Sequence, residues 1–230
     1  MRGLVVTGTD TGVGKTFVAC LLVRFLRAQG WEAGYLKLVS TGAPRSEDLA
    51  FALAAAGLAQ DPALERTLAP YSFPLPASPH LAAEQAGATI EPARLHAALA
   101  AAGRLFPFLV AEGAGGCLVP LTRDLLLADF LAETGLPALV VARTGLGTIN
   151  HSLLTVEALR RRQVPILGLV FSDGPSAPDA LLAEDNPRTV AAFAQVPVLG
   201  RLPPCPAQAA ADQAFAPIGQ RILQALGSER

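Results

Sequence analysis

The sequence predicts an α/β fold, a three-layer sandwich in which helices cover both faces of a mostly parallel sheet. Short runs of apolar and β-branched residues alternate along the chain with longer segments of helical periodicity. The runs are apolar throughout, which indicates strands that are buried on both faces. A glycine-rich segment separates the first run from the first helical segment, at the position where such sheets bind their ligands.

The length and composition favour one intracellular domain. The chain has 230 residues, of which 51% are hydrophobic and 16% are charged, and we expect residues 1–230 to form a single domain. The net charge of −1 gives no electrostatic reason to expect nucleic acid or an anionic membrane as a partner. Three cysteines without a Cys-x-x-Cys pair favour neither a disulfide framework nor a zinc site, so a reducing cytoplasm is expected.

No segment is expected to enter a membrane. The apolar stretch from Leu125 to Ala142 is interrupted by two acidic residues, a glycine and a proline, so it cannot span a bilayer. The apolar region before the first glycine-rich segment is too short for a signal peptide.

The first half of the chain begins with a strand at Gly3–Thr7, because this run is short, apolar and β-branched. Helical periodicity follows over about Lys15–Gln29, and Gly30 ends the helix because glycine readily adopts a left-handed conformation. A second strand is expected at Ala33–Leu38, and a helical segment at Glu47–Ala56.

A proline-rich stretch between Leu58 and Ile90 separates this half from the rest. A Glu-Pro pair then predicts the start of a helix that runs from 91 to 103. The later apolar runs alternate with helical patterns, and right-handed crossovers between them would place the functional loops at the carboxyl ends of the strands. The remaining strands are expected at 107–111, 138–142, 166–171 and 196–199, and helices at about 124–134, 148–162, 186–194 and 209–226.

The segment Gly8–Thr16, with the sequence GTDTGVGKT, is predicted to bind phosphate. Gly12 and Gly14 let the backbone of the loop, Val13 included, approach a phosphate at the N-terminus of a helix. Lys15 would reach the β- and γ-phosphates, and the Thr16 hydroxyl can bind Mg²⁺. The first glycine lies one position earlier than in the usual G-x-x-x-x-G-K-T spacing. A plain glycine turn before a helix is the competing interpretation, but the order of strand, loop and helix favours a P-loop NTPase-like fold.

Other chemical motifs are weaker. Gly145–Asn150 resembles half of a dinucleotide-binding fingerprint, but it lacks the third glycine and the acidic residue that should follow. No G-x-S-x-G motif occurs, and His80, His96 and His151 are too scattered to indicate a triad or a metal site.

Two carboxylates are candidates for holding Mg²⁺ beside the phosphates. Glu112 directly follows an apolar run and precedes Gly113, Ala114 and Gly115, a position better suited to a ligand than to core packing. Asp48 begins a helix after the second strand, and from the spacing alone a favourable interaction with the helix dipole is the better explanation for it.

Lysine usage singles out one further residue. Of the 18 basic residues only Lys15 and Lys37 are lysines, although a bias toward arginine codons would also produce this pattern. Lys37 ends the second predicted strand, so it must either extend to solvent or meet an anion. The carboxyl end of that strand is expected beside the phosphate loop, which favours a role for Lys37 at the γ-phosphate.

Five motifs in order resemble the dethiobiotin synthetases over nearly the whole chain. The phosphate loop at 8–16 is similar to the variant in that family, including its glycine spacing. Lys37–Gly42 is similar to the family's K-P-V-x-S/T-G segment, with leucine in place of proline. The other three motifs are Ser-Pro-His at 78–80, Glu-Gly-Ala-Gly-Gly at 112–116 and Leu-Gly-Thr-Ile-Asn-His at 146–151.

The resemblance implies a homodimeric enzyme that uses ATP and Mg²⁺. Its substrates would be 7,8-diaminopelargonic acid and CO₂, which supplies the ureido carbon of dethiobiotin. One amine becomes a carbamate, the carbamate receives the γ-phosphoryl group, and the second amine closes the ring and expels phosphate. This chemistry requires mainly positioning and stabilisation of charge.

The family's roles can be assigned to matching positions of this chain. Lys37 and Lys15 would be catalytic, with Lys37 at the carbamate. Thr11 and Thr41 would line the diamine site, and Gly147, Thr148, Ile149 and Asn150 would bind the substrate carboxylate across a subunit boundary. The metal ligands would be Thr16, Asp48 and Glu112. The nucleotide site would comprise Gly12, Val13, Gly14, Lys15, Thr16, Asp48, Glu112, Gly113, Ala114, Gly115, Ser172, Asp173, Leu202 and Pro203.

One position departs from the family pattern. Ser172 and Asp173 stand where the family usually has Asn-Asp, and the asparagine both donates to and accepts from adenine. A hydroxyl cannot reproduce that two-point contact, so the basis of nucleotide selection is open.

Two other functions are alternatives. A related ATP-dependent amide-forming ligase would require a glutamine-hydrolysing domain, for which no residues remain. A nucleotide switch of the MinD or ParA type would have an additional lysine early in the loop, where this chain has Gly8 and Thr9.

Overall fold

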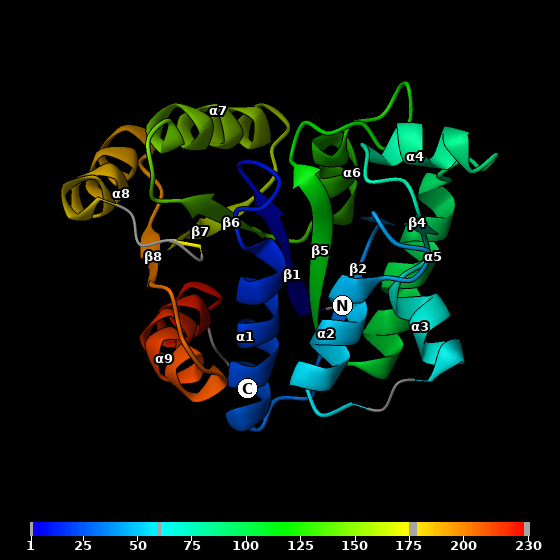
Figure 1. Cartoon of the computed structure of the whole chain (residues 1–230), viewed down its shortest axis with the longest axis horizontal. Coiled ribbons are helices and arrows are strands. Elements are labelled where there is room, and N and C mark those ends of the chain that lie inside the picture. Colours follow the sequence, from blue (N-terminus) through cyan, green and yellow to red (C-terminus); the bar gives the residue numbers. More distant parts are fainter. Residues whose placement is uncertain (1, 59–60, 175–178, 228–230) are drawn as a thin grey trace.

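The central sheet of the computed structural model has six parallel strands in the order β2-β5-β1-β6-β7-β8 (Figure 1). The structure describes residues 2–58, 61–174 and 179–227. The strands are β1 (Arg2–Gly8), β2 (Ala33–Lys37), β5 (Phe108–Gly116), β6 (Ala138–Arg143), β7 (Ile166–Ser172) and β8 (Val198–Leu202). The predicted α/β class is confirmed.

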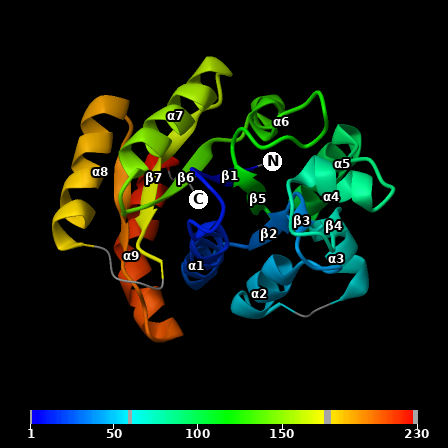
Figure 2. The same ribbon diagram turned by 45° about the horizontal axis from the view of Figure 1, so that its top comes forward.

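Helices cover both faces of the sheet, as Figure 2 shows. On one face lie α1 (Lys15–Ala28), α2 (Glu47–Ala55) and α9 (Gln208–Ala225). On the other lie α5 (Pro92–Leu105), α6 (Leu127–Thr134), α7 (Thr148–Arg161) and α8 (Ala180–Ala194). Covering both faces buries most of the apolar strand residues, which explains why these strands lack alternating polarity.

The proline-rich stretch contains regular structure that the sequence did not predict. Proline occupies the first helical position of α3 (Pro62–Leu68) and α4 (Pro79–Gln85), where its missing N–H costs nothing. Between the two helices, β4 (Ser72–Phe73) pairs in parallel with β3 (Ser40–Thr41) to form a separate two-stranded sheet. This pairing fixes the chain that follows β2, including Thr41.

Several predicted boundaries were wrong. The strand expected at 107–111 continues to Gly116, because β1 remains paired with it through Val6–Glu112 and, after a register shift, Gly8–Gly116. Glu112 therefore lies within β5 rather than after it. The helix expected at 186–194 begins at Ala180, where the Asp179 side chain accepts hydrogen bonds from two backbone N–H groups.

The neighbour of β2 also differs from the expectation. β5 lies between β1 and β2, so the end of β2 is one strand away from the phosphate loop. Lys37 pairs with Glu112 in the β2–β5 register, and Glu112 pairs with Val6 of β1. Side chains at paired positions project from the same face, so Lys37 reaches the loop region alongside Glu112.

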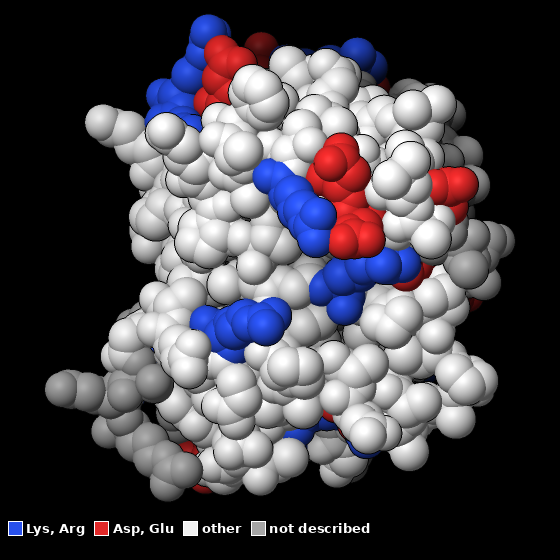
Figure 3. Space-filling model, turned by 90° about the vertical axis from the view of Figure 1, so that its left-hand side faces the viewer, with Lys and Arg blue, Asp and Glu red and all other residues white. Residues whose placement is uncertain are grey.

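The surface over α8, β8 and α9 carries few charges, and most of its basic side chains lie beside acidic ones (Figure 3). Two of its ion pairs are Arg188–Glu184 and Arg201–Asp173. Among the described helices, none combines the length and the apolar character that crossing a bilayer would require.

Candidate nucleotide and substrate site

The phosphate loop joins β1 to α1, and two of its glycines adopt backbone conformations that other residues disfavour. Gly12 has φ of 73° and Gly14, the residue that caps α1, has φ of 92°. A Cβ atom on Gly14 would lie 2.8 Å from Ser172 Oγ. Both steric space and backbone conformation thus require glycine at position 14.

Lys15 begins α1 and points back into the loop. Its side-chain ammonium donates a hydrogen bond of 2.8 Å to the Asp10 carbonyl oxygen, and the residue is 7% exposed. Burial lowers the pKa of Lys15 to about 8, and repulsion from Lys37 acts in the same direction, whereas Glu112, Asp48 and Asp10 oppose the shift. An anion bound in the loop would favour the protonated form.

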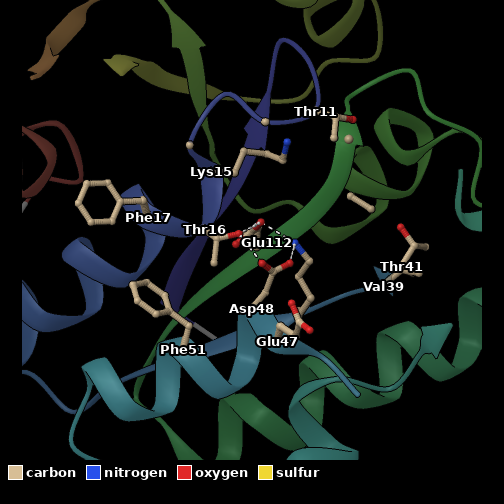
Figure 4. A pocket seen from close by; sticks show the side chains of 15 residues that line it. Thr11, Lys15, Thr16, Phe17, Val39, Thr41, Glu47, Asp48, Phe51 and Glu112 are labelled. Atoms are coloured by element: carbon tan, nitrogen blue, oxygen red, sulfur yellow. Dashed lines mark hydrogen bonds and ion pairs between the residues drawn. The ribbon is translucent and has the colours of Figure 1, made fainter. Parts of the chain in front are cut away.

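Three oxygen atoms converge beside Lys15 (Figure 4). The Thr16 hydroxyl lies 3.0 Å from Asp48 Oδ1 and 2.9 Å from Glu112 Oε1. One hydroxyl has one hydrogen and cannot donate fully to both carboxylates. The three oxygens therefore form a site that attracts a further cation.

Lys37 supplies a positive charge to this cluster. Its Nζ atom lies 2.6 Å from Asp48 Oδ2 and 2.5 Å from Glu112 Oε1. Although burial alone would lower it, the pKa of Lys37 is raised by the two carboxylates and their hydrogen bonds. Lys37 therefore remains charged although its side chain is only 6% exposed.

Tyr35 completes the environment of Glu112, and the sequence analysis missed it. Its hydroxyl donates a hydrogen bond of 2.7 Å to Glu112 Oε2, and both residues are almost fully buried. Burial, followed by repulsion from Glu112 and Asp48, raises the pKa of Tyr35 well above its usual value, so it stays a donor. Its position two residues before Lys37 in β2 was the available signal, since alternate strand residues share a face.

The donor set fits Mg²⁺. Among the described residues no cluster of three His, Cys, Asp or Glu side chains could hold a metal ion. Two carboxylates and one hydroxyl nevertheless suit Mg²⁺, which usually takes few protein ligands and completes its coordination with phosphate oxygens and water.

A pocket of about 580 Å³ brings most of the predicted residues together. Its wall includes the two lysines, both expected substrate threonines and the three expected metal ligands. It also includes residues that the sequence analysis missed, among them Glu47 and Phe51, which lie on α2 beside Asp48 and one turn after it. The predicted residues in the wall are Thr11, Gly12, Gly14, Lys15, Thr16, Lys37, Thr41, Asp48, Glu112, Ala114 and Gly115.

Val13 and Gly113 are buried behind this wall rather than in it. A Cβ atom on Gly113 would lie 2.6 Å from Leu127 Cδ2, so close packing against α6 requires glycine there. Both residues support the backbone next to the pocket.

A second pocket, of about 630 Å³, adjoins the first. Ser172 and Pro203, which the resemblance assigns to the nucleotide, line it, whereas Leu202 is buried. The carboxylate of Asp173 is outside its described wall. That carboxylate accepts hydrogen bonds from Arg201 at 2.8–3.1 Å and from Thr144 at 2.8 Å, so its side chain is already occupied.

The expected carboxylate-binding segment lies apart from both described pocket walls. Gly147 caps the N-terminus of α7 with φ of 87°, and no side chain caps it. The buried Thr148 hydroxyl donates to the Arg143 carbonyl oxygen, while Asn150 is exposed. Within one chain, Gly147, Thr148, Ile149 and Asn150 are therefore not brought to Lys37.

Comparison with known proteins shows the family to which this chain belongs. The protein named ATP-dependent dethiobiotin synthetase BioD of Paramagnetospirillum magneticum is 41% identical over 217 residues, covering 94% of this chain and 95% of the relative. The protein of the same name from Novosphingobium aromaticivorans is 46% identical, with 88% of each chain covered. This chain belongs to the dethiobiotin synthetase family. The resemblance predicted from the motifs is confirmed.

Broader comparisons agree with the fold of this synthetase-family chain. A family model described as an AAA domain matches residues 2–211. The cell division ATPase MinD of Pyrococcus furiosus matches with a TM-score of 0.61 at 20% identity, covering 97% of this chain and 98% of that structure. A ParA family ATPase from Chlorobium tepidum matches with a TM-score of 0.54 at 15% identity, covering 99% of this chain and 94% of that one. At these identities only the fold is shared.

The Tyr35–Glu112 hydrogen bond generates a prediction about stability. Tyr35→Phe is expected to lower the free energy of unfolding by about 1.5–3 kcal/mol, because a buried carboxylate oxygen loses its donor. Urea denaturation followed by circular dichroism measures this change. In a Glu112→Gln background the same substitution should cost less, since no buried charge remains. An equal cost in both backgrounds would show that the hydroxyl does not stabilise the carboxylate.

Proposed function

We propose that this chain is an ATP-dependent dethiobiotin synthetase, which joins 7,8-diaminopelargonic acid to CO₂ in the ureido ring of dethiobiotin. ATP is converted to ADP and phosphate. The observation that supports this reaction best is the convergence of two buried ammonium groups, Lys15 and Lys37, on one pocket. The names of the relatives support the same activity. A cytoplasmic location, expected from the cysteine pattern, is part of the proposal.

The first bond forms between one amine of the substrate and CO₂, and loss of a proton leaves a carbamate anion. A buried ammonium whose pKa is raised by neighbouring carboxylates is suited to hold that anion, so we assign Lys37 to it. Thr11 and Thr41 line the same pocket and supply hydroxyls for the diamine and the carbamate.

A carbamate oxygen then attacks the γ-phosphorus, the bond to the bridging oxygen breaks, and ADP leaves. The reaction needs little covalent help from the protein but depends on position and positive charge. Lys15 and the backbone N–H groups of residues 12–16 are assigned to the phosphates. In the last step the second amine attacks the carbamate carbon, the C–O bond to phosphate breaks, and a proton is released.

Mg²⁺ stabilises negative charge on transferring phosphates when it is bound. Thr16, Asp48 and Glu112 would hold it. Ala114 and Gly115 lie in the same wall, so we include them in the nucleotide site. Ser172, Leu202 and Pro203 are assigned to the surroundings of the base. Asp173 is assigned a supporting role next to them, because it accepts a hydrogen bond from Arg201 on β8.

We further propose a homodimer in which the start of α7 binds the substrate carboxylate of the partner's site. The segment 147–150 offers an uncapped helix N-terminus, which favours an anion. It lies outside the described pocket of its own chain, so a second copy must bring it to that pocket.

Mixing two variants tests this shared site. Lys37→Ala and Asn150→Asp homodimers are each expected to show low activity, the second because it places a negative charge near the substrate carboxylate. A mixed dimer in which Asn150 serves the partner's Lys37 has one intact site, so mixing with subunit exchange should raise activity severalfold above either variant alone. Light scattering gives the oligomeric state. A fully active monomer, or no gain in mixed dimers of verified composition, would contradict the shared site.

Substitution of the two lysines is expected to impair different steps, turnover for Lys37 and nucleotide binding for Lys15. Lys37→Ala is expected to keep nucleotide binding but lose turnover equivalent to about 3–4 kcal/mol, because its charge is needed as phosphoryl transfer develops. Lys15→Ala is the matched variant and should weaken nucleotide affinity, measured by calorimetry. A near-normal turnover number for Lys37→Ala, or unchanged affinity for Lys15→Ala, would remove the assigned role.

The reaction itself is tested by measuring phosphate release from ATP with and without diaminopelargonate and bicarbonate. We expect release only when both are present, in step with formation of the ureido product. Steady release that does not depend on the diamine would instead favour an ATPase switch.

A further inference from the structure

The second pocket lacks the charge that defines the first. Its described wall consists of glycines, prolines, Phe17, Ser172 and Cys205, with no charged side chain among them. The Cys205 thiol donates to the Pro203 carbonyl oxygen, and Ser172 is 5% exposed. A triphosphate or a substrate carboxylate would therefore find no ionic partner in the described wall. The wall suits a flat, uncharged group.

Phe17 connects the two pockets. It follows Thr16 in the first turn of α1 and, with Gly12 and Gly14, lines both cavities. Figure 4 shows its ring on the opposite side of the first pocket from Thr41. A ligand with a triphosphate in the loop and an uncharged group in the second pocket must pass this ring.

We propose that Phe17 is a binding residue for the nucleoside of ATP, with its partly exposed ring as the platform against which the base lies. This inference rests on the proposed function, because it takes ATP as the ligand. Every base has a π-face, so contact with a phenyl ring does not depend on the hydrogen-bonding edge of the base. The ring thus supplies affinity where Ser172 offers only a hydroxyl.

Phe51 provides a contrast within the same region. Its ring is 45% exposed and lines only the first pocket, near Asp48. It therefore belongs to the wall of the first pocket and is outside the described wall of the uncharged pocket. Only Phe17 among the described aromatic residues borders both.

Inorganic tripolyphosphate separates the nucleoside contribution from that of the phosphates. Calorimetry with Mg²⁺ would compare ATP and tripolyphosphate binding to the wild type and to Phe17→Ala. We expect the variant to bind ATP about tenfold more weakly and tripolyphosphate within twofold of the wild type. Retained tripolyphosphate binding also reports an intact loop.

Three further variants sharpen the test. Phe17→Trp should keep ATP affinity, because it preserves a flat aromatic face, whereas Phe17→Leu should lose part of it. Phe193→Ala is the matched control, since that phenylalanine of α8 is 74% exposed and outside both described pocket walls. This variant should change the affinity for neither ATP nor tripolyphosphate. Equal weakening of ATP and tripolyphosphate by Phe17→Ala, or unchanged ATP affinity, would overturn the proposal.

These binding measurements are independent of turnover. If the wild type binds ATP with the expected Phe17 pattern but forms no ureido product, the proposed reaction fails and the nucleoside platform stands. If product forms while Phe17→Ala binds ATP normally, the platform fails and the reaction stands.

Discussion

The buried carboxylate of Glu112 constrains the architecture around it. The residue has no solvent exposure and lies in the interior of the sheet, where an uncompensated charge would be strongly unfavourable. Compensation comes from the ammonium of Lys37, the hydroxyl of Thr16 and the hydroxyl of Tyr35. These partners belong to β2 and α1, so the folding of three elements and the assembly of the site depend on the same contacts.

The strand order explains how two lysines distant in sequence come to share one cavity. Placing β5 between β1 and β2 sets Glu112 between the loop that carries Lys15 and the strand that ends in Lys37. Each ammonium is then buried near carboxylates, yet their pKa values move in opposite directions, because only Lys37 contacts both acids directly. An anion bound in the phosphate loop would thus stabilise the protonated form of Lys15. The charge of Lys37 is already compensated by two carboxylates.

The fold alone does not separate a synthetase from a nucleotide switch, because MinD and ParA ATPases share it at 15–20% identity. The distinction lies in the relatives at 41–46% identity over most of the chain, and the proposed synthetase reaction assigns Lys37 and Thr41, which line the first pocket, to the substrate. The pairing of β3 with β4 holds Thr41 in this position. The proline-rich segment that contains β4 therefore contributes directly to the geometry of the pocket.

The sequence by itself determined the α/β class, the phosphate loop and the family, because glycine spacing, apolar runs and short motifs are local properties. Tertiary structure decided what depends on distant contacts: that β5 separates β1 from β2, that Glu112 lies inside a strand, and that Asp173 is occupied by Arg201. Tyr35 and Phe17 were missed for the same reason. Their neighbours Glu112 and Ser172 are 77 and 155 positions away, and only folding brings such residues together.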